Sequence, residues 1–358
     1  MTIREQLPVW KCLLQEQSMY KALRRVVTAL ISLLLLIFII TVAFSKNTFI
    51  VYRLFLFQPF KNPRLLKTII DNSAPLILCG LGVITAFRSG NFSLAGEGQV
   101  YTAMLTTAVT AFAIEHHGAS SGLVLSLAII AGVIMAGIIS IPIALVGRSK
   151  RENVLLISFM VSQGLLYIVD GFIAGPLRDH SNNLVATAMF TARLPSIIPV
   201  FPITFSFLIA IFVTFALWLF FERTPHGVML TLYGRNETFA KLQGYPVLIF
   251  SWIPIIISGF LHGLAGSLIV TVSYGRVIRG MSGGIGWNAI GTSLIAANKP
   301  AFIPFAALLF SWLDTMTQYT SALGYLSFNN TILIKALVIL FIASRKPDFL
   351  FVKRASLL

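Results

Sequence analysis

Long apolar runs alternate along the chain with short polar connections. An α-helix of about 20 residues crosses the roughly 30 Å of hydrocarbon in a bilayer, and several runs have that length without a charge. The pattern predicts ten crossings, at about 26–44, 66–88, 96–115, 121–147, 152–174, 197–221, 247–272, 285–298, 301–317 and 329–344. A transmembrane β-barrel would instead show stretches of about ten residues with alternating hydrophobicity. We therefore expect an all-α polytopic membrane protein, with residues 1–358 forming one transmembrane domain.

Composition agrees with this placement in lipid. Of the 358 residues, 57% are hydrophobic and 11% are charged, whereas about 25% of residues are charged in soluble domains. The net charge of +15 comes from scattered clusters of Lys and Arg, which form no basic stripe of the kind that nucleic acid requires. The two cysteines, Cys12 and Cys79, lie far apart and outside any metal-ligand spacing. We expect neither nucleic acid nor a metal to bind.

The distribution of Lys and Arg predicts the orientation, because cytoplasmic segments carry an excess of both residues. Placing the N-terminus inside puts the basic clusters at 21–25, 148–151 and 345–354 on the cytoplasmic side. The apolar run after Arg25 exceeds a signal-peptide core and has no clear cleavage site, which indicates a retained first helix. We expect both termini in the cytoplasm, with residues 1–25 as a cytoplasmic N-terminal segment.

One polar connection on the predicted cytoplasmic side, residues 222–246, is long enough to hold structure of its own. Within it, Phe239 and Leu242 can share one face of a short helix while charged neighbours meet water. A short helix lying on the inner membrane surface fits this pattern, and an ordinary interfacial linker is the alternative.

Each half of the chain contains one glycine-interrupted segment, at 88–99 and at 279–288. Unwound backbone at membrane depth persists only where protein buries it or where it lines a cavity, so a corresponding pair of broken segments indicates a transport pathway. Close helix packing through small residues is the other explanation for the glycines, and it alone could account for Gly263 and Gly266.

Polar side chains in these segments and in the helices that follow the second one are the candidates for the pathway, since a polar group at membrane depth costs a few kcal/mol unless it is paired or hydrated. Two aromatic residues among them could stack on a planar ligand. The candidate set is Asn91, Phe92, Ser93, Glu97, Gln99, Trp287, Asn288, Thr292 and Asp314. Asp314 and Lys335 lie in adjacent predicted helices, so an ion pair is the default explanation for them. His262 stands alone on an apolar helix, where a packing role is more common.

The chain has no GxxxxGK[ST] phosphate loop, so we expect that it does not itself bind ATP in the usual way. It also has no spacing typical of a catalytic triad or a metal centre. These features favour a transport subunit over an enzyme, with no cofactor bound by this chain.

Four elements occur in order along the chain: the sequence from 90 to 99 ending in Gly-Glu-Gly-Gln, and the segments 224–236, 259–266 and 284–296. Together they resemble the ordered motifs of the ribose, branched-chain amino acid and nucleoside type ABC importer permeases. The version with Gly-Glu-Gly-Gln resembles the branch associated with nucleosides, riboflavin and simple sugars.

This resemblance implies partners: two ABC ATPase subunits that use ATP and Mg, a second permease that is either another copy or a paralogue, and an extracytoplasmic substrate-binding protein or lipoprotein. It also implies a multi-pass location in the cytoplasmic (inner) membrane. Residues 222–246 would be the cytoplasmic coupling loop. The residues expected to contact the ATPase are Arg235, Asn236, Glu237, Phe239, Lys241 and Leu242.

The sequence thus predicts the permease subunit of an ATP-driven importer that moves a small polar solute, such as riboflavin, a nucleoside or a simple sugar, into the cytoplasm by alternating access. The aromatic pair Phe92 and Trp287 favours a planar ligand. The alternative is an ion-coupled secondary transporter, in which Glu97, Asp314 and Lys335 would be the coupling groups.

Overall fold

The computed structural model describes residues 48–149, 153–195, 204–325 and 337, and within them the chain is helical, with isolated β-bridges but no strand. The helices are α2 (Thr48–Lys61), α3 (Pro63–Arg88), α4 (Gly96–His116), α5 (Ser121–Ser149), α6 (Val154–Ala174), α7 (Phe205–Arg223), α8 (Pro225–Arg235), α9 (Glu237–Leu242), α10 (Val247–Ile269), α11 (Ile285–Ile295) and α12 (Ile303–Ala322). A π-helical turn (Val270–Tyr274) extends α10, and a 3-10 turn (Pro300–Phe302) precedes α12.

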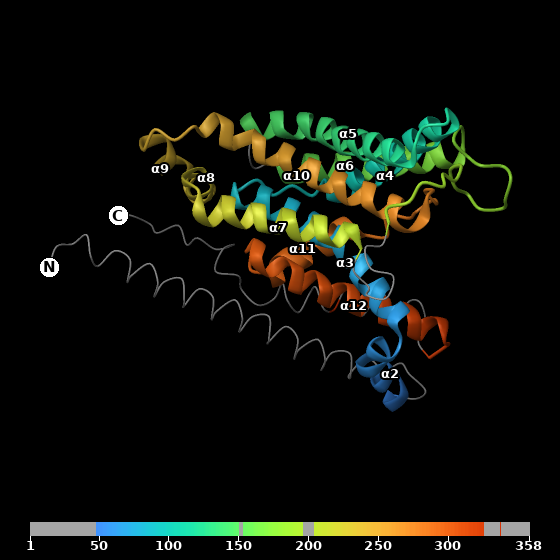
Figure 1. Ribbon diagram of the computed structural model, residues 1–358. Helices are drawn as coiled ribbons and strands as arrows, with labels where there is room; N and C mark the ends of the chain where they lie inside the picture. Colours follow the sequence, from blue (N-terminus) through green and yellow to red (C-terminus); the bar gives the residue numbers. More distant parts are fainter. Residues whose placement is uncertain (1–47, 150–152, 196–203, 326–336, 338–358) are drawn as a thin grey trace.

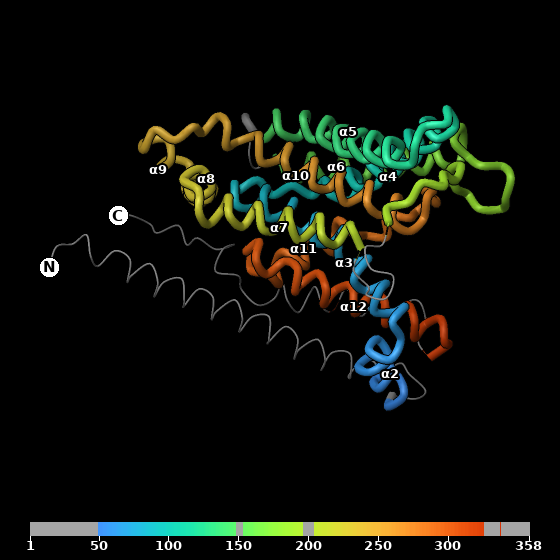
Figure 2. Tube along the Cα trace, in the orientation of Figure 1, coloured from blue at the N-terminus to red at the C-terminus, as the bar shows by residue number. Residues whose placement is uncertain are grey.

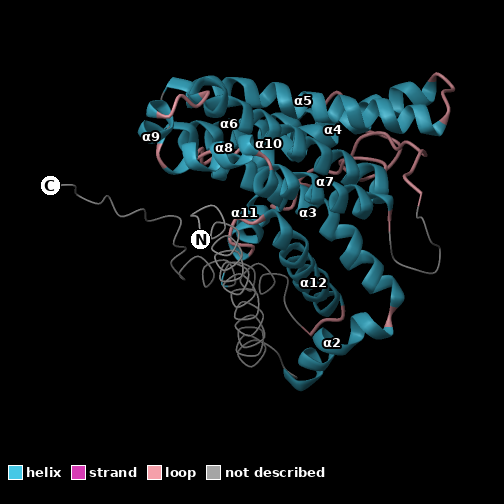
Figure 3. Ribbon diagram, turned by 60° about the vertical axis from the view of Figure 1, so that its left-hand side comes forward, coloured by secondary structure: helices cyan, strands magenta, loops and turns pink. Residues whose placement is uncertain are grey.

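The long helices lie side by side along one direction (Figure 1). The short helices α8 and α9 are at one end of the bundle, and the loop after α6 is at the other; the path of the chain between them can be followed in Figure 2. The helices α11 and α12 lie on one side and α4, α5 and α6 on the other (Figure 3). Between these two groups, α3 packs on α7, α10, α11 and α12, and α10 also packs on α4 and α5.

Six helices in the described part of the chain are long and apolar enough to cross a membrane, namely α3, α5, α6, α7, α10 and α12, the last two counted with their adjoining π and 3-10 turns. The helix α11 has 11 residues, which span about 16 Å and cannot cross a bilayer. The predicted first crossing at 26–44 lies outside the described residues, as does that at 329–344 apart from Leu337. The predicted run 285–298 is therefore not a full crossing, which lowers the predicted total of ten. The cytoplasmic location of both termini stays a prediction.

Burial separates central from peripheral helices. In α3, 83% of the most apolar window is buried inside the protein, against 22% in both α6 and α7. A helix that is apolar all round is stable only where other helices or lipid surround it, so α3 is a core helix while α5, α6 and α7 present large apolar side chains outwards. Small residues allow close packing in the core, since a Cβ at Gly259 of α10 would collide with Ser140 of α5. The packing interpretation of Gly263 and Gly266 agrees with the structure, because a Cβ at Gly263 would collide with Ala136 of α5 and one at Gly266 with the Val100 carbonyl of α4.

Candidate functional site

The two glycine-interrupted segments meet at Glu97, in the first turn of α4. Its Oε1 accepts a hydrogen bond from the Gly284 N–H at 2.9 Å, and its Oε2 accepts one from the Gly286 N–H at 2.6 Å. Only 3% of Glu97 is exposed. A Cβ at Gly286 would collide with the Glu97 backbone, so glycine is required for this approach. Gly284, with φ of 79°, turns the chain into α11 in the left-handed conformation that glycine favours.

Gln99, two residues further along α4, belongs to a buried polar contact among three helices. Its Nε2 donates to Ser140 Oγ of α5 at 2.9 Å, and its Oε1 lies 2.8 Å from Nδ1 of His262 in α10. His262 is buried, and its ring fits closely against Gly82 and Gly96. The packing role predicted for this histidine therefore agrees with its position, and Gln99 binds its neighbours in the bundle.

The unwound segment before α4, residues 89–95, is held by side chains from other helices. Asn91 is fully buried, and its Nδ2 donates to Ser89 Oγ and to the Ser251 carbonyl. Two serines of α6 accept from backbone N–H groups, Ser158 from Leu94 and Ser162 from Gly98. The sequence interpretation missed both serines, because the donors they satisfy lie more than 60 residues away in the chain.

A cavity of about 520 Å³ lies beside the start of α11, between α3, the end of α10 and α12. The polar and aromatic side chains that line it are Asn72, Tyr274, Ser282, Asn288, Phe310, Ser311, Asp314 and Gln318. Two of the predicted pathway residues, Asn288 and Asp314, are in this lining. Lys335, the predicted ion-pair partner of Asp314, lies outside the described residues.

The other predicted pathway residues are not in the lining of this cavity. Phe92 packs on Phe87, with ring centroids 5.0 Å apart, and Trp287 packs edge-on against Phe159 at 5.9 Å. Thr292 is buried and donates to the Asn288 carbonyl, while Ser93 is also buried, in the unwound segment. Their predicted contact with substrate stays a prediction.

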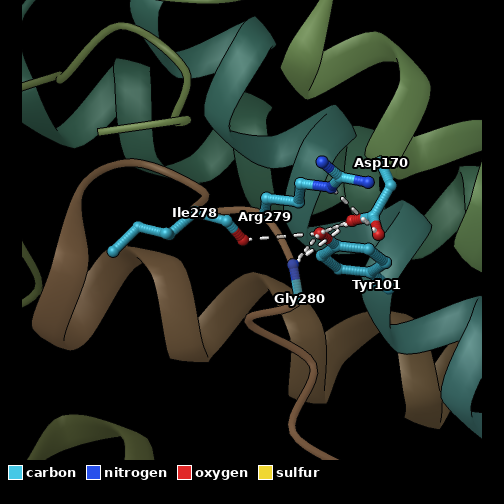
Figure 4. A network of polar contacts seen from close by, with 5 residues as sticks. All are labelled: Tyr101, Asp170, Ile278, Arg279 and Gly280. Carbon is cyan, nitrogen blue, oxygen red and sulfur yellow. Dashed lines mark hydrogen bonds and ion pairs between the residues drawn. The ribbon is translucent and has the colours of Figure 1, made fainter. Parts of the chain in front are cut away.

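A second polar network ties the loop before α11 to the other half of the chain (Figure 4). Tyr101 Oη of α4 donates to Asp170 Oδ1 of α6 at 2.6 Å. The Gly280 N–H donates to Tyr101 Oη at 2.8 Å and to Asp170 Oδ1 at 3.2 Å, and Arg279 lies 3.7 Å from the same carboxylate. No sequence motif marked Tyr101, because its partners come from two distant segments.

At the end of the bundle that carries α8 and α9, Arg88 connects three elements. Its Nη2 lies 3.0 Å from Glu222 Oε1 at the end of α7, and its Nε donates to the Asn298 carbonyl after α11. In α8, a Cβ at Gly234 would collide with the Arg88 carbonyl and lie against the Gly90 N–H. The α8–α9 segment is therefore in direct contact with the turn that begins the first unwound segment.

The predicted coupling segment forms two helices where the sequence indicated one. Arg235 ends α8, and the Asn236 side chain begins α9 by accepting from the Phe239 N–H at 2.9 Å. Glu237 and Lys241 form an ion pair of 2.8 Å along α9. Phe239 is 43% exposed and Leu242 is 81% exposed, so α9 presents apolar side chains at the surface of the chain.

Comparison with known proteins gives a consistent result. A sequence model of the family described as branched-chain amino acid transport system / permease component matches residues 65–343. The chain is 26% identical to the probable riboflavin import permease protein RfuC of Treponema pallidum, over 90% of this chain and 86% of the relative. It is 25% identical to the nucleoside ABC transporter permease protein NupB of Lactococcus lactis, over 82% of this chain and 84% of the relative. It is also 25% identical to the glucose ABC transporter permease protein TsgB13 of Haloferax volcanii, over 77% of this chain and 75% of the relative. No solved structure matches significantly.

Proposed function

Since the chain belongs to the permease component family of branched-chain amino acid transport systems, we propose that it is the membrane-spanning subunit of an ATP-driven importer. It is a multi-pass membrane protein and a transport subunit, not an enzyme in its own right. In this proposal it moves a small polar solute of the riboflavin, nucleoside or sugar class into the cytoplasm. That range is the one named for its relatives.

The contact between α8 and the first unwound segment carries this proposal. The exposed apolar side chains of α9 provide a surface for a cytoplasmic ATPase subunit, and Gly234 of α8 rests on the backbone of Arg88. A displacement of α9 therefore reaches the turn at 88–90 through packed backbone. From there it reaches Glu97 and, through two hydrogen bonds, the start of α11 beside the cavity. Mechanical coupling of ATP binding to the pathway needs a connection of this kind.

The proposal also includes the orientation of the chain in the membrane and the other subunits of the assembly. In this proposal α8, α9 and both termini are cytoplasmic, and the loop after α6 faces outwards, where a substrate-binding protein or lipoprotein delivers the solute. A second permease, identical or paralogous, completes the path in the cytoplasmic membrane. ATP and Mg belong to the ATPase subunits, and this chain binds no cofactor of its own.

The test replaces the exposed apolar residues of α9. A tagged chain is purified in mild detergent from its native membranes, and the ATPase activity that co-elutes is measured. The variant Leu242→Asp should lose most of this activity, because a charged side chain replaces an apolar contact. The matched control is Leu184→Asp in the loop after α6, which is also exposed, at 52%, and should retain the activity. Equal ATPase activity in the two variants contradicts the docking surface.

The ion-coupled secondary transporter is separated from this proposal by the energy source. Uptake of radiolabelled riboflavin, guanosine and glucose is measured in vesicles of the native host, with ATP supplied inside or with only a proton or sodium gradient. The importer requires ATP and is insensitive to ionophores. Uptake that proceeds without ATP and disappears with an ionophore refutes the proposal and supports the alternative.

A further inference from the structure

The short helix α2 has one packed side and one exposed side. Val51 and Phe55, which are 0% and 1% exposed, belong to a buried cluster with Leu313 of α12. Positions two residues apart lie on nearly opposite sides of an α-helix, because each residue turns the helix by about 100°. Phe49 and Arg53, each two residues before one of the packed positions, therefore lie on the side that faces away from α12.

The exposed side of α2 alternates aromatic and basic side chains. Phe49, Arg53, Phe57 and Lys61 follow one another at intervals of four residues, and residues four apart lie on the same face of a helix. All four are exposed, Phe49 at 80% and Phe57 at 57%. They line a groove of about 280 Å³ on this face. We call these four residues the α2 stripe.

Length and composition suit α2 to the surface of a membrane. Its 14 residues span about 21 Å, which is less than the roughly 30 Å of hydrocarbon in a bilayer. Exposed phenylalanines are stable at the boundary between headgroups and acyl chains, where interfacial helices lie. The stems of Arg53 and Lys61 can follow this boundary while their charged ends reach the headgroups. Both Figure 1 and Figure 3 show α2 at the edge of the bundle, beside the start of α3.

The charge around α2 is positive and has few acidic neighbours. Four Lys or Arg and no Asp or Glu occur between residues 48 and 70. Of these four, Lys67 has an acidic neighbour on α3, whereas Arg53, Lys61 and Arg64 are exposed and take part in none of the ion pairs among the described residues. Arg64 also lies in the first turn of α3, where the partial positive charge of the helix end repels a cation. An anion at this place would be attracted by all three side chains.

From these observations we propose that the α2 stripe is a binding site for an anionic phospholipid. The phosphate lies at the charged ends of Arg53 and Lys61, and the acyl chains lie against Phe49 and Phe57. Each Lys or Arg near an anionic lipid surface strengthens binding about fivefold, whereas a zwitterionic lipid carries its own cation beside the phosphate. An acidic protein surface would match the charges, but a phospholipid carries the anion and the apolar chains together, as the alternating stripe requires.

The site is connected to the cavity through α12. The ring of Phe55 packs edge-on against Trp312, with ring centroids 6.0 Å apart, and Gln58 Nε2 donates to Tyr319 Oη at 3.3 Å. Gln318, next to Tyr319 in α12, is part of the cavity lining. A lipid that holds α2 at the membrane surface therefore also supports the helix that forms one side of the cavity.

Photochemical cross-linking in native membranes tests the site. Phe57 is replaced by the photoreactive p-benzoylphenylalanine in the otherwise intact chain, the membranes are irradiated, and the lipids attached to the chain are identified by mass spectrometry. The ratio of anionic to zwitterionic lipid among the adducts should be at least about fivefold higher than in lipid extracted from the same membranes. A ratio equal to that of the extracted lipid overturns the proposal.

Charge removal assigns the effect to the α2 stripe. Adding Arg53→Gln to the photoreactive chain should lower the ratio at least about threefold, and adding Lys61→Gln should lower it further. Both side chains are exposed, so neither change removes a packing contact inside the bundle. The matched control is Arg276→Gln in the loop after α10, whose charge acts on Asp179 nearby, and it should leave the ratio unchanged. An equal effect of Arg53→Gln and Arg276→Gln contradicts the proposal.

Other occupants of this face give different products. A second copy of the chain or an acidic partner protein on α2 would be attached at position 57 as a cross-linked protein of higher mass. Such a product as the main adduct overturns the assignment to lipid. Since no step of this experiment measures transport or ATP hydrolysis, its result is independent of the proposed importer function.

Discussion

Replacement of Glu97 gives the sharpest test of how the two unwound segments are joined. In Glu97→Gln, one oxygen still accepts a hydrogen bond, but the new amide group faces a backbone N–H that also donates. Losing one hydrogen bond to a charged group costs about 1.5–3 kcal/mol, so we expect about 2 kcal/mol of destabilisation. Glu97→Ala leaves the N–H groups of Gly284 and Gly286 without their acceptor, and we expect about 4 kcal/mol.

The assay is thermal inactivation of the purified complex in detergent, followed as the fraction that stays monodisperse, together with ATP-dependent uptake. Uptake should be reduced in Glu97→Gln and abolished in Glu97→Ala, with the complex still assembled at low temperature. The control is Glu115→Gln at the other end of α4, where the carboxylate accepts from Thr191 in an exposed position and water can replace it. Equal thermal inactivation of Glu97→Gln and Glu115→Gln would refute the reasoning.

Three further substitutions, the first with a matched control, test neighbouring contacts. Gly286→Ala should inactivate transport and lower the thermal midpoint, because the new Cβ collides with the Glu97 backbone. The control is Gly280→Ala, whose Cβ meets open space and which should cost only about 1 kcal/mol for the left-handed conformation of this residue. Comparable melting curves of the two variants would contradict this reasoning. Tyr101→Phe removes a donor to Asp170 and should cost about 1 kcal/mol, measured in the same melt, and an unchanged midpoint would argue against the network. Gly234→Ala should reduce ATP-dependent uptake while ATPase co-purification persists; normal uptake would mean that α8 does not transmit motion.

The bounds of the long helices could be predicted well from the sequence. The predicted run 66–88 corresponds to α3, which begins earlier because Pro63 and the Asn62 cap start a helix ahead of the apolar residues. The run 96–115 corresponds to α4, and 121–147 to α5. Such runs are readable because charged or glycine-rich residues end them. The π-helical turn after α10 could not be predicted, because the apolar run passes through Val270–Tyr274 without a residue pattern that marks a wider helix.

The candidate site was predictable in its residues more than in its contacts. Glu97 and Gln99 stand out in sequence because polar side chains at membrane depth need partners. The identity of those partners depends on tertiary packing: the Glu97 carboxylate binds backbone groups 187 and 189 residues further along the chain. The lining of the cavity is equally hidden, because Asn72 and Phe310 belong to no motif and come together only when α3 packs on α12.

The burial of α3 also constrains how the protein is made. Its main neighbours α7, α10, α11 and α12 are all synthesised after it, so a nascent chain that has reached the end of α6 contains a helix whose main packing partners are missing. Arg88 is then without Glu222, its partner in the finished fold. During biogenesis α3 must be held by lipid, by the insertion machinery or by transient contacts until the second half arrives. Chains truncated after α6 should therefore be degraded or retained by chaperones, and correct folding of the first half depends on completion of the second.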